Sequence, residues 1–212
     1  MKNTDQQLEA LHDIRKMMQD SSKFLSLSGL SGVFAGVYAL VGAYFGTLVM
    51  AEYVFSHLME EESEQAYQNL LLKICLICAG VLVLSIVTAL FFSSRKAKRN
   101  GQKLFDHTSK KLLVNMLVPL LTGGLFCLAL VLHGNGFVLM VSPAMLLFYG
   151  LALINSSKFT LHDIRYLGYL EVILGLIAAF LPGYGLLFWA IGFGVLHIVY
   201  GGIMWFKYDR AK

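Results

Sequence analysis

The sequence has few charged residues, few cysteines and few prolines. Charged side chains make up only 14% of its 212 residues, whereas about a quarter is usual in a soluble domain. Three cysteines and three prolines are too few for a secreted disulfide scaffold or a collagen-like chain. Hydrophobic residues, in contrast, make up 57% of the chain, and the mean hydropathy is +0.67. This composition predicts an integral membrane protein with a single membrane domain.

Apolar segments that can cross a bilayer account for most of the chain. A membrane helix needs roughly 17 to 25 residues, and six segments approach or exceed that length: 24–50, 70–92, 112–132, 137–154, 166–181 and 186–206. The fourth and fifth are short, so the bilayer must thin or flanking side chains must snorkel there. None of the six alternates apolar and polar residues as barrel strands do. The fold class expected is all-α: a polytopic bundle of six transmembrane helices over residues 24–206.

The basic residues indicate the orientation of this bundle. In a six-helix topology nearly all lysines and arginines fall on one side, with Lys73 as the exception. Because cytoplasmic loops are enriched in these residues, both termini are expected in the cytoplasm, including the short tail 207–212. The connection 93–111 is strongly basic and is interpreted as a topology signal beside anionic lipid headgroups, not as a nucleic-acid site.

The N-terminal residues 1–23 lack the apolar core of a signal peptide. Apolar residues instead recur there at spacings of three and four, which predicts an amphipathic helix in the cytoplasm. Two interpretations stay open for this helix. It lies along the inner membrane surface, or it caps the cytoplasmic end of the bundle.

Small residues recur at helical spacing in several of the spans. Close packing drives helix association in lipid, so small residues mark contact faces. The expected packing residues are Ser28, Gly32, Gly36, Gly42, Gly46, Gly168, Gly175, Gly194 and Gly201. They indicate packing within the bundle, and self-association into a homo-oligomer is the alternative.

Two ionisable residues lie inside the last two spans. Glu171 and His197 each have small residues on their own helix face, and the turn 182–185 joins their helices as an antiparallel hairpin. Counting from that turn places the two residues at the same depth. An ionisable group at that depth is costly unless it faces a partner or water. We therefore expect Glu171 and His197 to be paired or to share a water, with Tyr200 and Arg165 within reach of the same intramembrane site.

This polar site has two interpretations that the sequence leaves open. A carboxylate beside an imidazole in a medium of low dielectric can hold or pass a proton, an ion or a polar ligand. Alternatively, the pair only fixes the register of the two helices. No other motif predicts a cofactor or a metal site: the thiols of Cys75 and Cys78 lie on an apolar helix without further ligands, and no phosphate-binding loop occurs.

One tetrapeptide, Gly29-Leu-Ser-Gly32, resembles the nucleophile motif of rhomboid intramembrane proteases. Catalysis of that kind would require Ser31 beside His197. The serine lies on the first span and not on the fourth, and the family's His-x-x-x-Asn is missing. An intramembrane hydrolase or a lipid-modifying enzyme is thus a minor alternative, and the sequence favours a protein that is not an enzyme without deciding the question.

Over its full length the chain resembles a family of small inner-membrane proteins of Bacteroidota-type bacteria. The resemblance is carried by residues 24–36, by Asp163-Ile-Arg-Tyr-Leu-Gly-Tyr-Leu-Glu171 and by Phe193-Gly-Val-Leu-His-Ile-Val-Tyr-Gly201. It implies a bacterial cytoplasmic membrane. No activity is established for such a family, so the resemblance transfers no functional residues.

Two functions are consistent with these features. The first is a small transport, channel or proton-linked membrane protein built around Glu171 and His197. The second is a membrane sensor or scaffold that docks a cytoplasmic protein partner through residues 1–23, the basic connection 93–111 and the segment 161–165. Proton flux that depends on Glu171 would favour the first, and co-purification of a partner lost with the N-terminal residues would favour the second.

Overall fold

The computed structural model describes residues 28–59, 64–99, 101 and 107–210, so the amphipathic helix expected within residues 1–23 lies outside the described residues. In this part of the chain all regular structure is helical, and no strand occurs. The long helices are α2 (Gly29–Met59), α3 (Glu64–Arg99), α4 (His107–Leu132), α5 (Val141–Ser156) and α6 (Asp163–Phe180). Short 3-10 segments, η1 (Asn135–Met140) and η2 (Ser157–Phe159), flank α5.

The last helix is continuous but changes its winding along its length. It runs through α7 (Gly185–Trp189), the π-helical η3 (Ala190–Leu196), α8 (His197–Met204) and the π-helical η4 (Trp205–Asp209). We call these four segments together the C-terminal helix. A π-helical turn is wider than an α-helical turn and occurs frequently at functional sites.

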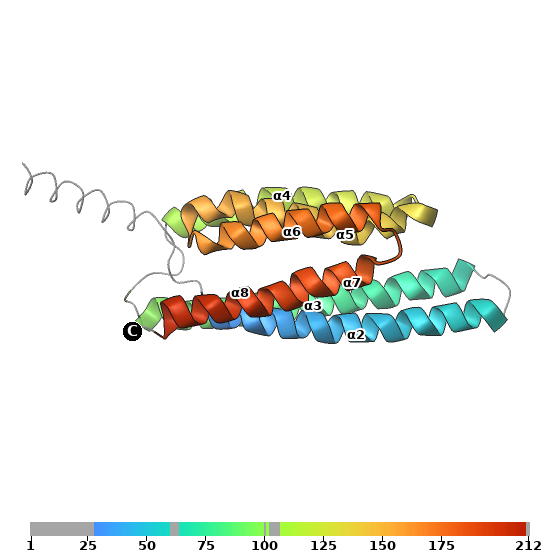
Figure 1. The fold of residues 1–212 in the computed structure, drawn as a ribbon, viewed down its shortest axis with the longest axis horizontal. Coiled ribbons are helices and arrows are strands. Elements are labelled where there is room, and N and C mark those ends of the chain that lie inside the picture. The colour runs from blue at the N-terminus through green and yellow to red at the C-terminus, as the bar shows by residue number, and fades with distance from the viewer. Residues whose placement is uncertain (1–27, 60–63, 100, 102–106, 211–212) are drawn as a thin grey trace, which may run out of the picture.

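The described helices form two layers of three. One layer contains α2, α3 and the C-terminal helix, and the other contains α4, α5 and α6 (Figure 1). The chain returns from α6 to the first layer through a turn in which Gly183 has a φ of +100°, a conformation that residues with a Cβ rarely adopt. Among the described helices, the C-terminal helix alone contacts both α2 and α5 closely, so it connects the layers.

One end of this bundle is strongly basic. At this end α3 finishes, α4 and α6 begin, and the C-terminal helix finishes beside the start of α2 (Figure 1). Its basic residues include Arg95, Lys96, Lys98, Arg99, Lys110, Lys111, Lys158, Arg165, Lys207 and Arg210. We call it the basic end.

The expected packing glycines lie where backbones approach one another. A Cβ on Gly32 would lie 3.2 Å from the Cα of Gly201, and a Cβ on Gly36 would lie 2.6 Å from the carbonyl oxygen of Gly194. In the other layer, a Cβ on Gly168 would lie 2.8 Å from the carbonyl oxygen of Gly150. These glycines therefore allow close contact between helices of one chain.

The remaining predicted packing residues also contact neighbouring helices. A Cβ on Gly42 would meet Val81 of α3, and a Cβ on Gly46 would lie 3.4 Å from Leu186 of α7. A Cβ on Gly175 would lie 3.0 Å from the backbone nitrogen of Leu147 in α5.

Pro119 interrupts the hydrogen bonding of α4. Proline has no N–H to donate to the carbonyl four residues earlier, which here belongs to Asn115. The side-chain amide of Asn155 in α5 donates to that carbonyl oxygen at 2.8 Å. A neighbouring helix thus satisfies the backbone group that the proline leaves unpaired, as membrane helices require.

The outer surface of the bundle is apolar. Leu76, Leu82 and Phe91 of α3 are each more than half exposed. Five of the described helical stretches are long and apolar enough to cross a membrane: Gly29–Ser56, Glu64–Arg99, His107–Leu132, Gly136–Phe159 and Gly185–Asp209. The fifth predicted span is not among them, because the 18 residues of α6 include the charged residues Asp163, Arg165 and Glu171. The chain has the character of an integral membrane protein.

Candidate functional site

Glu171 and His197 lie together at the interface between the two layers. Glu171 is near the middle of α6, and His197 follows the π-helical segment η3 in the C-terminal helix. His197 Nδ1 lies 3.6 Å from Glu171 Oε1. Tyr149 of α5 and Gly192 of η3 complete this group, which we call the central cluster.

The hydrogen bonds of His197 determine its tautomer. Its Nδ1 lies 3.0 Å from the carbonyl oxygen of Gly192, which can only accept, so Nδ1 carries the proton. The other nitrogen, Nε2, lies 2.7 Å from the hydroxyl of Tyr149. In the neutral ring Nε2 is an acceptor, and Tyr149 donates to it. Both ring nitrogens are therefore engaged, and the ring is held in one orientation.

The carboxyl group of Glu171 has no such partners. Its side chain is 0% exposed, and neither oxygen has a hydrogen-bond partner among the described residues. The distance of 3.6 Å to His197 Nδ1 is too long for a hydrogen bond. A buried polar group without a partner costs about 1–3 kcal/mol, and a charged one costs more. The central cluster thus contains a carboxyl group that is enclosed but not satisfied.

Gly192 provides the space for this carboxyl group. A Cβ at this position would lie 2.6 Å from Glu171 Oε2 and 2.5 Å from the Leu146 side chain, which is itself fully buried. The π-helical winding of η3 also brings the Gly192 carbonyl, five residues before His197, within reach of the imidazole. The backbone of the C-terminal helix therefore shapes one wall of the site.

Aromatic rings enclose His197 on its other side. The ring centroids of Tyr149 and Phe193 lie 5.3 and 6.0 Å from that of His197. Phe193 also packs against Trp189 at 5.4 Å. The indole nitrogen of Trp189 is buried and has no hydrogen-bond partner in the described part of the chain. These rings limit access of water to the imidazole from that side.

The other two residues predicted for the intramembrane site lie elsewhere. Arg165 is at the start of α6, where its Nε donates to Ser157 Oγ at 3.4 Å. Tyr200 packs against a hydrophobic cluster that includes Leu153 and Met204. Neither makes a hydrogen bond or ion pair with Glu171 or His197 within the described ranges.

Tyr149 is the site residue that sequence reasoning missed. The available signal was a tyrosine followed by Gly150, inside an apolar span. Its hydroxyl needs a partner when buried, and a polar group on a facing helix would supply one. The sequence contains no direct indication that α5 faces the C-terminal helix at that level.

The serine of the rhomboid-like tetrapeptide does not join the imidazole. Ser31 Oγ donates to the carbonyl oxygen of Ser28 at 2.6 Å. The two nitrogens of His197 are engaged by Gly192 and Tyr149, so no Ser–His pair is formed. Within the described residues, no group of three or more histidine, cysteine or acidic side chains could hold a metal ion.

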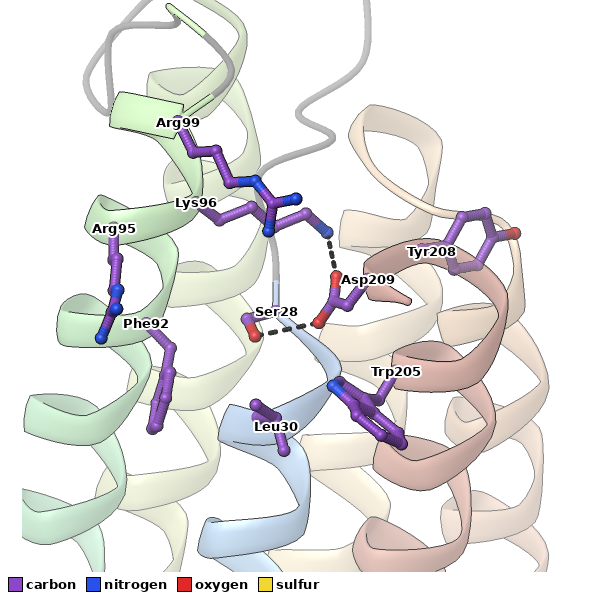
Figure 2. Close-up of a pocket in the computed structure, with 9 residues that line it drawn as sticks. All are labelled: Ser28, Leu30, Phe92, Arg95, Lys96, Arg99, Trp205, Tyr208 and Asp209. Carbon is purple, nitrogen blue, oxygen red and sulfur yellow. Dashed lines mark hydrogen bonds and ion pairs between the residues drawn. The ribbon is translucent and has the colours of Figure 1, made fainter. Parts of the chain in front are cut away.

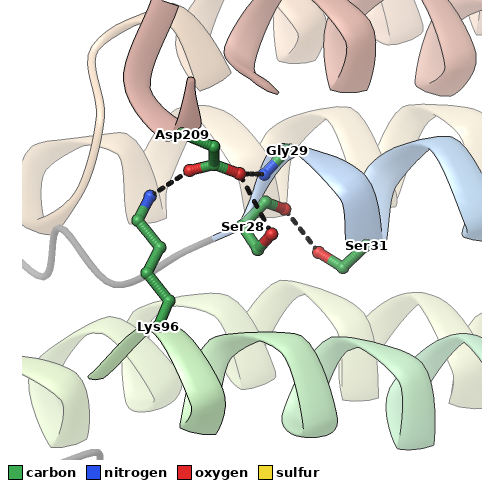
Figure 3. Close-up of polar contacts among 5 residues, drawn as sticks. All are labelled: Ser28, Gly29, Ser31, Lys96 and Asp209. Carbon is green, nitrogen blue, oxygen red and sulfur yellow. Dashed lines mark hydrogen bonds and ion pairs between the residues drawn. The ribbon is translucent and has the colours of Figure 1, made fainter. Parts of the chain in front are cut away.

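A second polar cluster lies at the basic end. Asp209 accepts hydrogen bonds through Oδ2 from the backbone N–H of Gly29 at 2.9 Å and from Ser28 Oγ at 3.1 Å, and its Oδ1 lies 2.6 Å from Lys96 Nζ (Figure 3). The first backbone N–H groups of a helix have no partner within the helix and attract negative charge. Asp209 thus caps α2 from the opposite end of the chain. We call these four residues the terminal cluster.

Comparison with known proteins gives no relative of this chain. No family model matches it, and no curated protein and no solved structure is significantly similar to it.

Proposed function

We propose that this chain is a proton-linked membrane protein, of the transport or channel kind, in which the central cluster binds and releases a proton. The observation that carries the proposal is the carboxyl group of Glu171. It is fully enclosed, has no hydrogen-bond partner among the described residues, and faces the imidazole of His197 at 3.6 Å.

The chemistry of the cluster supports this function over a purely structural one. A pair that only fixed the helix register would be expected to satisfy both members, because an unsatisfied polar group destabilises the bundle. Here the histidine is satisfied and the carboxyl group is not. A proton bound to Glu171 would remove the cost of the buried carboxylate, and acidic residues and histidines are common in the proton relays of membrane proteins.

The position of the cluster also favours a protein that moves between two arrangements. Glu171 and Tyr149 belong to one layer, whereas His197 belongs to the other. A displacement of one layer against the other would change the distance between carboxyl and imidazole. Proton binding would then be coupled to the relative position of the layers, as alternating access requires.

The proposal includes a membrane topology. We infer that α6 is a sixth crossing, that the protein resides in a bacterial cytoplasmic membrane, and that its basic end faces the cytoplasm. In support, the hydrogen bond between Gly29 and Asp209 brings the first and last described helices to the same end, which fits an even number of crossings. The concentration of lysine and arginine at that end agrees with the rule for cytoplasmic loops.

Proton flux measured in proteoliposomes tests the function. The purified chain is reconstituted with a pH-sensitive dye inside the vesicles, and a potassium diffusion potential drives protons inward. We expect acidification with the native chain and at least a tenfold lower rate with Glu171→Gln. The matched control is Glu52→Gln, the same chemical change in an exposed ion pair with Lys73 at the opposite end of the bundle.

A second measurement applies if the flux needs a co-substrate. Infrared difference spectra between acidic and neutral pH detect the C=O stretch of a protonated carboxyl group. We expect a band that disappears in Glu171→Gln and shifts in His197→Gln. If Glu171→Gln leaves both the spectrum and the flux unchanged, the cluster does not handle protons and the proposal is wrong.

A further inference from the structure

A pocket of about 290 Å³ opens at the basic end, between α2, α3 and the end of the C-terminal helix. Figure 2 shows its walls: Phe92, Arg95 and Arg99 come from α3, Trp205 and Asp209 come from η4, and the start of α2 lies between them. The proposed proton site does not use this pocket.

The described residues that line the pocket carry a net positive charge. Three of them are cationic (Arg95, Lys96 and Arg99), and one is a carboxylate, Asp209. Lys96 is paired with Asp209 at 2.6 Å. Arg95 and Arg99 are four residues apart and thus lie on one face of α3. Figure 2 shows their guanidinium groups on different sides of the pocket, that of Arg99 toward Lys96 and Asp209 and that of Arg95 beside Phe92. Each guanidinium presents a planar set of donors that matches phosphate oxygens.

The inner part of the same pocket is apolar. Leu30, Phe92 and Trp205 line it, and each is partly buried. Charge at the mouth and apolar surface behind it match an amphiphile and not a small soluble anion, which would leave the apolar wall without a partner. A phospholipid has the same arrangement: a charged phosphate headgroup, followed by the glycerol and the apolar start of its acyl chains.

The depth of the pocket fits the same ligand. It lies at the end of the bundle, where α3 and the C-terminal helix finish, and Trp205 and Tyr208 are beside it. Tryptophan and tyrosine are enriched at the level of lipid headgroups. Basic pockets between membrane helices at this level bind anionic lipid headgroups.

We propose that this pocket binds the phosphate group of an anionic lipid, with Arg95 and Arg99 as the phosphate ligands and Leu30, Phe92 and Trp205 against its apolar part. Bound there, the lipid contacts α2, α3 and the C-terminal helix and holds these three helices together. The ion pair of Lys96 with Asp209 stays intact in this arrangement and forms the inner side of the polar half of the pocket.

Trp205 provides a direct reporter for the test. The chain has two tryptophans, so Trp189→Phe leaves Trp205 as the only indole fluorophore. The full chain is reconstituted in phosphatidylcholine vesicles, and brominated phosphatidylglycerol or brominated phosphatidylcholine is added to quench Trp205. The test pair is Arg95→Gln with Arg99→Gln. The matched control removes two charges of the same end outside the pocket, Lys98→Gln with Lys111→Gln.

We expect brominated phosphatidylglycerol to quench Trp205 at lower mole fraction than brominated phosphatidylcholine. One basic side chain at a membrane surface contributes about fivefold in affinity, so the double arginine variant should lose roughly 25-fold of this preference. The double lysine control should keep most of it. Native mass spectrometry of the chain with both tryptophans should show retained phosphatidylglycerol, lost in the arginine variant.

Three results would overturn the proposal. The first is equal quenching by the two lipids, and the second is equal loss of preference in the arginine and lysine variants. The third concerns the source of the phosphate. If millimolar inorganic phosphate removes the quenching by phosphatidylglycerol at constant ionic strength, with sulfate of equal strength having no effect, the pocket selects a soluble phosphate and not a lipid.

Discussion

The central cluster and the terminal cluster both contain a largely buried carboxyl group, but only one of these groups is satisfied. Asp209 has a partner on each oxygen: Lys96 on Oδ1, and Ser28 with the N–H of Gly29 on Oδ2. Its side chain retains 12% exposure. Glu171 has 0% exposure and no hydrogen bond from any described residue.

The two clusters thus differ in whether the charge of the buried carboxyl group is compensated by its neighbours. The hydrogen bonds and the ion pair of Asp209 connect the end of the C-terminal helix with the start of α2 and with α3, and they cap α2, so the charge of Asp209 is compensated. The carboxyl group of Glu171 is more deeply buried than that of Asp209. An uncompensated charge costs more free energy there, yet Glu171 receives no hydrogen bond from the described residues. Buried polar groups are normally satisfied, and exceptions to this rule are expected at functional sites.

The largest effect is expected from Gly201→Ala, because Gly201 lies on the C-terminal helix between the two clusters. Its Cβ would lie 2.5 Å from the backbone nitrogen of Val33 and 2.8 Å from the carbonyl oxygen of Gly29. Backbone atoms cannot move aside as a flexible side chain can, so α2 must separate from the C-terminal helix. We expect a loss of about 3 kcal/mol or more, at the upper end of overpacking effects, measured as a lower midpoint of thermal unfolding in detergent.

The adjacent glycine provides the control for that change. A Cβ on Gly202 would meet no atom of a neighbouring helix within 4 Å in the described part of the bundle. Gly202→Ala should leave the unfolding midpoint unchanged or raise it, since alanine is the better helix former by about 1 kcal/mol. Equal destabilisation by the two substitutions would show that α2 and the C-terminal helix do not pack as described.

The second-largest effect on stability is expected when the charge of each buried carboxyl group is removed in turn. Asp209→Asn removes the charge opposite Lys96 and weakens the cap of α2, and we expect it to lower the free energy of unfolding by about 2 kcal/mol. Glu171→Gln likewise replaces a carboxyl group by an amide, but Glu171 has no hydrogen bond to lose among the described residues. We expect the free energy of unfolding to stay within about 0.5 kcal/mol of the native value or to increase. The measurement is unfolding of both variants under identical conditions. A larger loss in Glu171→Gln than in Asp209→Asn would reverse our assignment of the two clusters.

Sequence reasoning brought Glu171 and His197 to one level because short-range features determine that geometry. The turn around Gly183 and the small residues near each side chain all lie within the continuous segment 168–201. The residues of the terminal cluster, in contrast, are far apart in the sequence: Gly29 and Asp209 are separated by 180 residues. Their contact depends on how α2 packs against the C-terminal helix, which no local pattern specifies.

The position of Tyr149 and the π-helical segment η3 could not be predicted from the sequence for the same reason. Nothing in the periodicity of α5 indicates which of its faces contacts the C-terminal helix, because both its lipid-facing and its interior residues are apolar. Gly192 and Gly194 of η3 lie against Leu146 and Leu40 of neighbouring helices, and no local sequence pattern specifies these neighbours. The composition likewise predicts membrane helices well, but α6 combines a short length with three charged residues, and its crossing stays a prediction.

A smaller effect is expected from Tyr149→Phe, which tests how His197 is held. The change removes the donor 2.7 Å from His197 Nε2 and leaves the ring packing in place. We expect a loss of about 1 kcal/mol, typical of one hydrogen bond. Thermal unfolding measures it, with Tyr166→Phe as the control because Tyr166 is 59% exposed. If both variants are equally stable, the hydroxyl of Tyr149 does not contribute to holding the imidazole.

The smallest effect concerns Asp163, a carboxyl group at the basic end that adjoins water. Burial alone would raise the pKa of Asp163, but hydrogen bonds from Lys207 and Tyr208 and the charge of Lys207 outweigh it, so the pKa lies below its ordinary value. Because the folded state favours the ionised form, this stabilisation is complete above the unfolded pKa of about 3.9 and is lost as the pH falls through the lower folded value.

We therefore expect the native chain to be more stable than Asp163→Asn at neutral pH, by less than about 1 kcal/mol because the pair is partly exposed. The difference should persist to about pH 5 and vanish below the folded pKa, as shown by unfolding midpoints of both chains across this range. Added salt should reduce the difference at neutral pH, since Lys207 is more than half exposed. A difference that grew on acidification would mean that Asp163 is held in its neutral form, and the basic end would then resemble the central cluster.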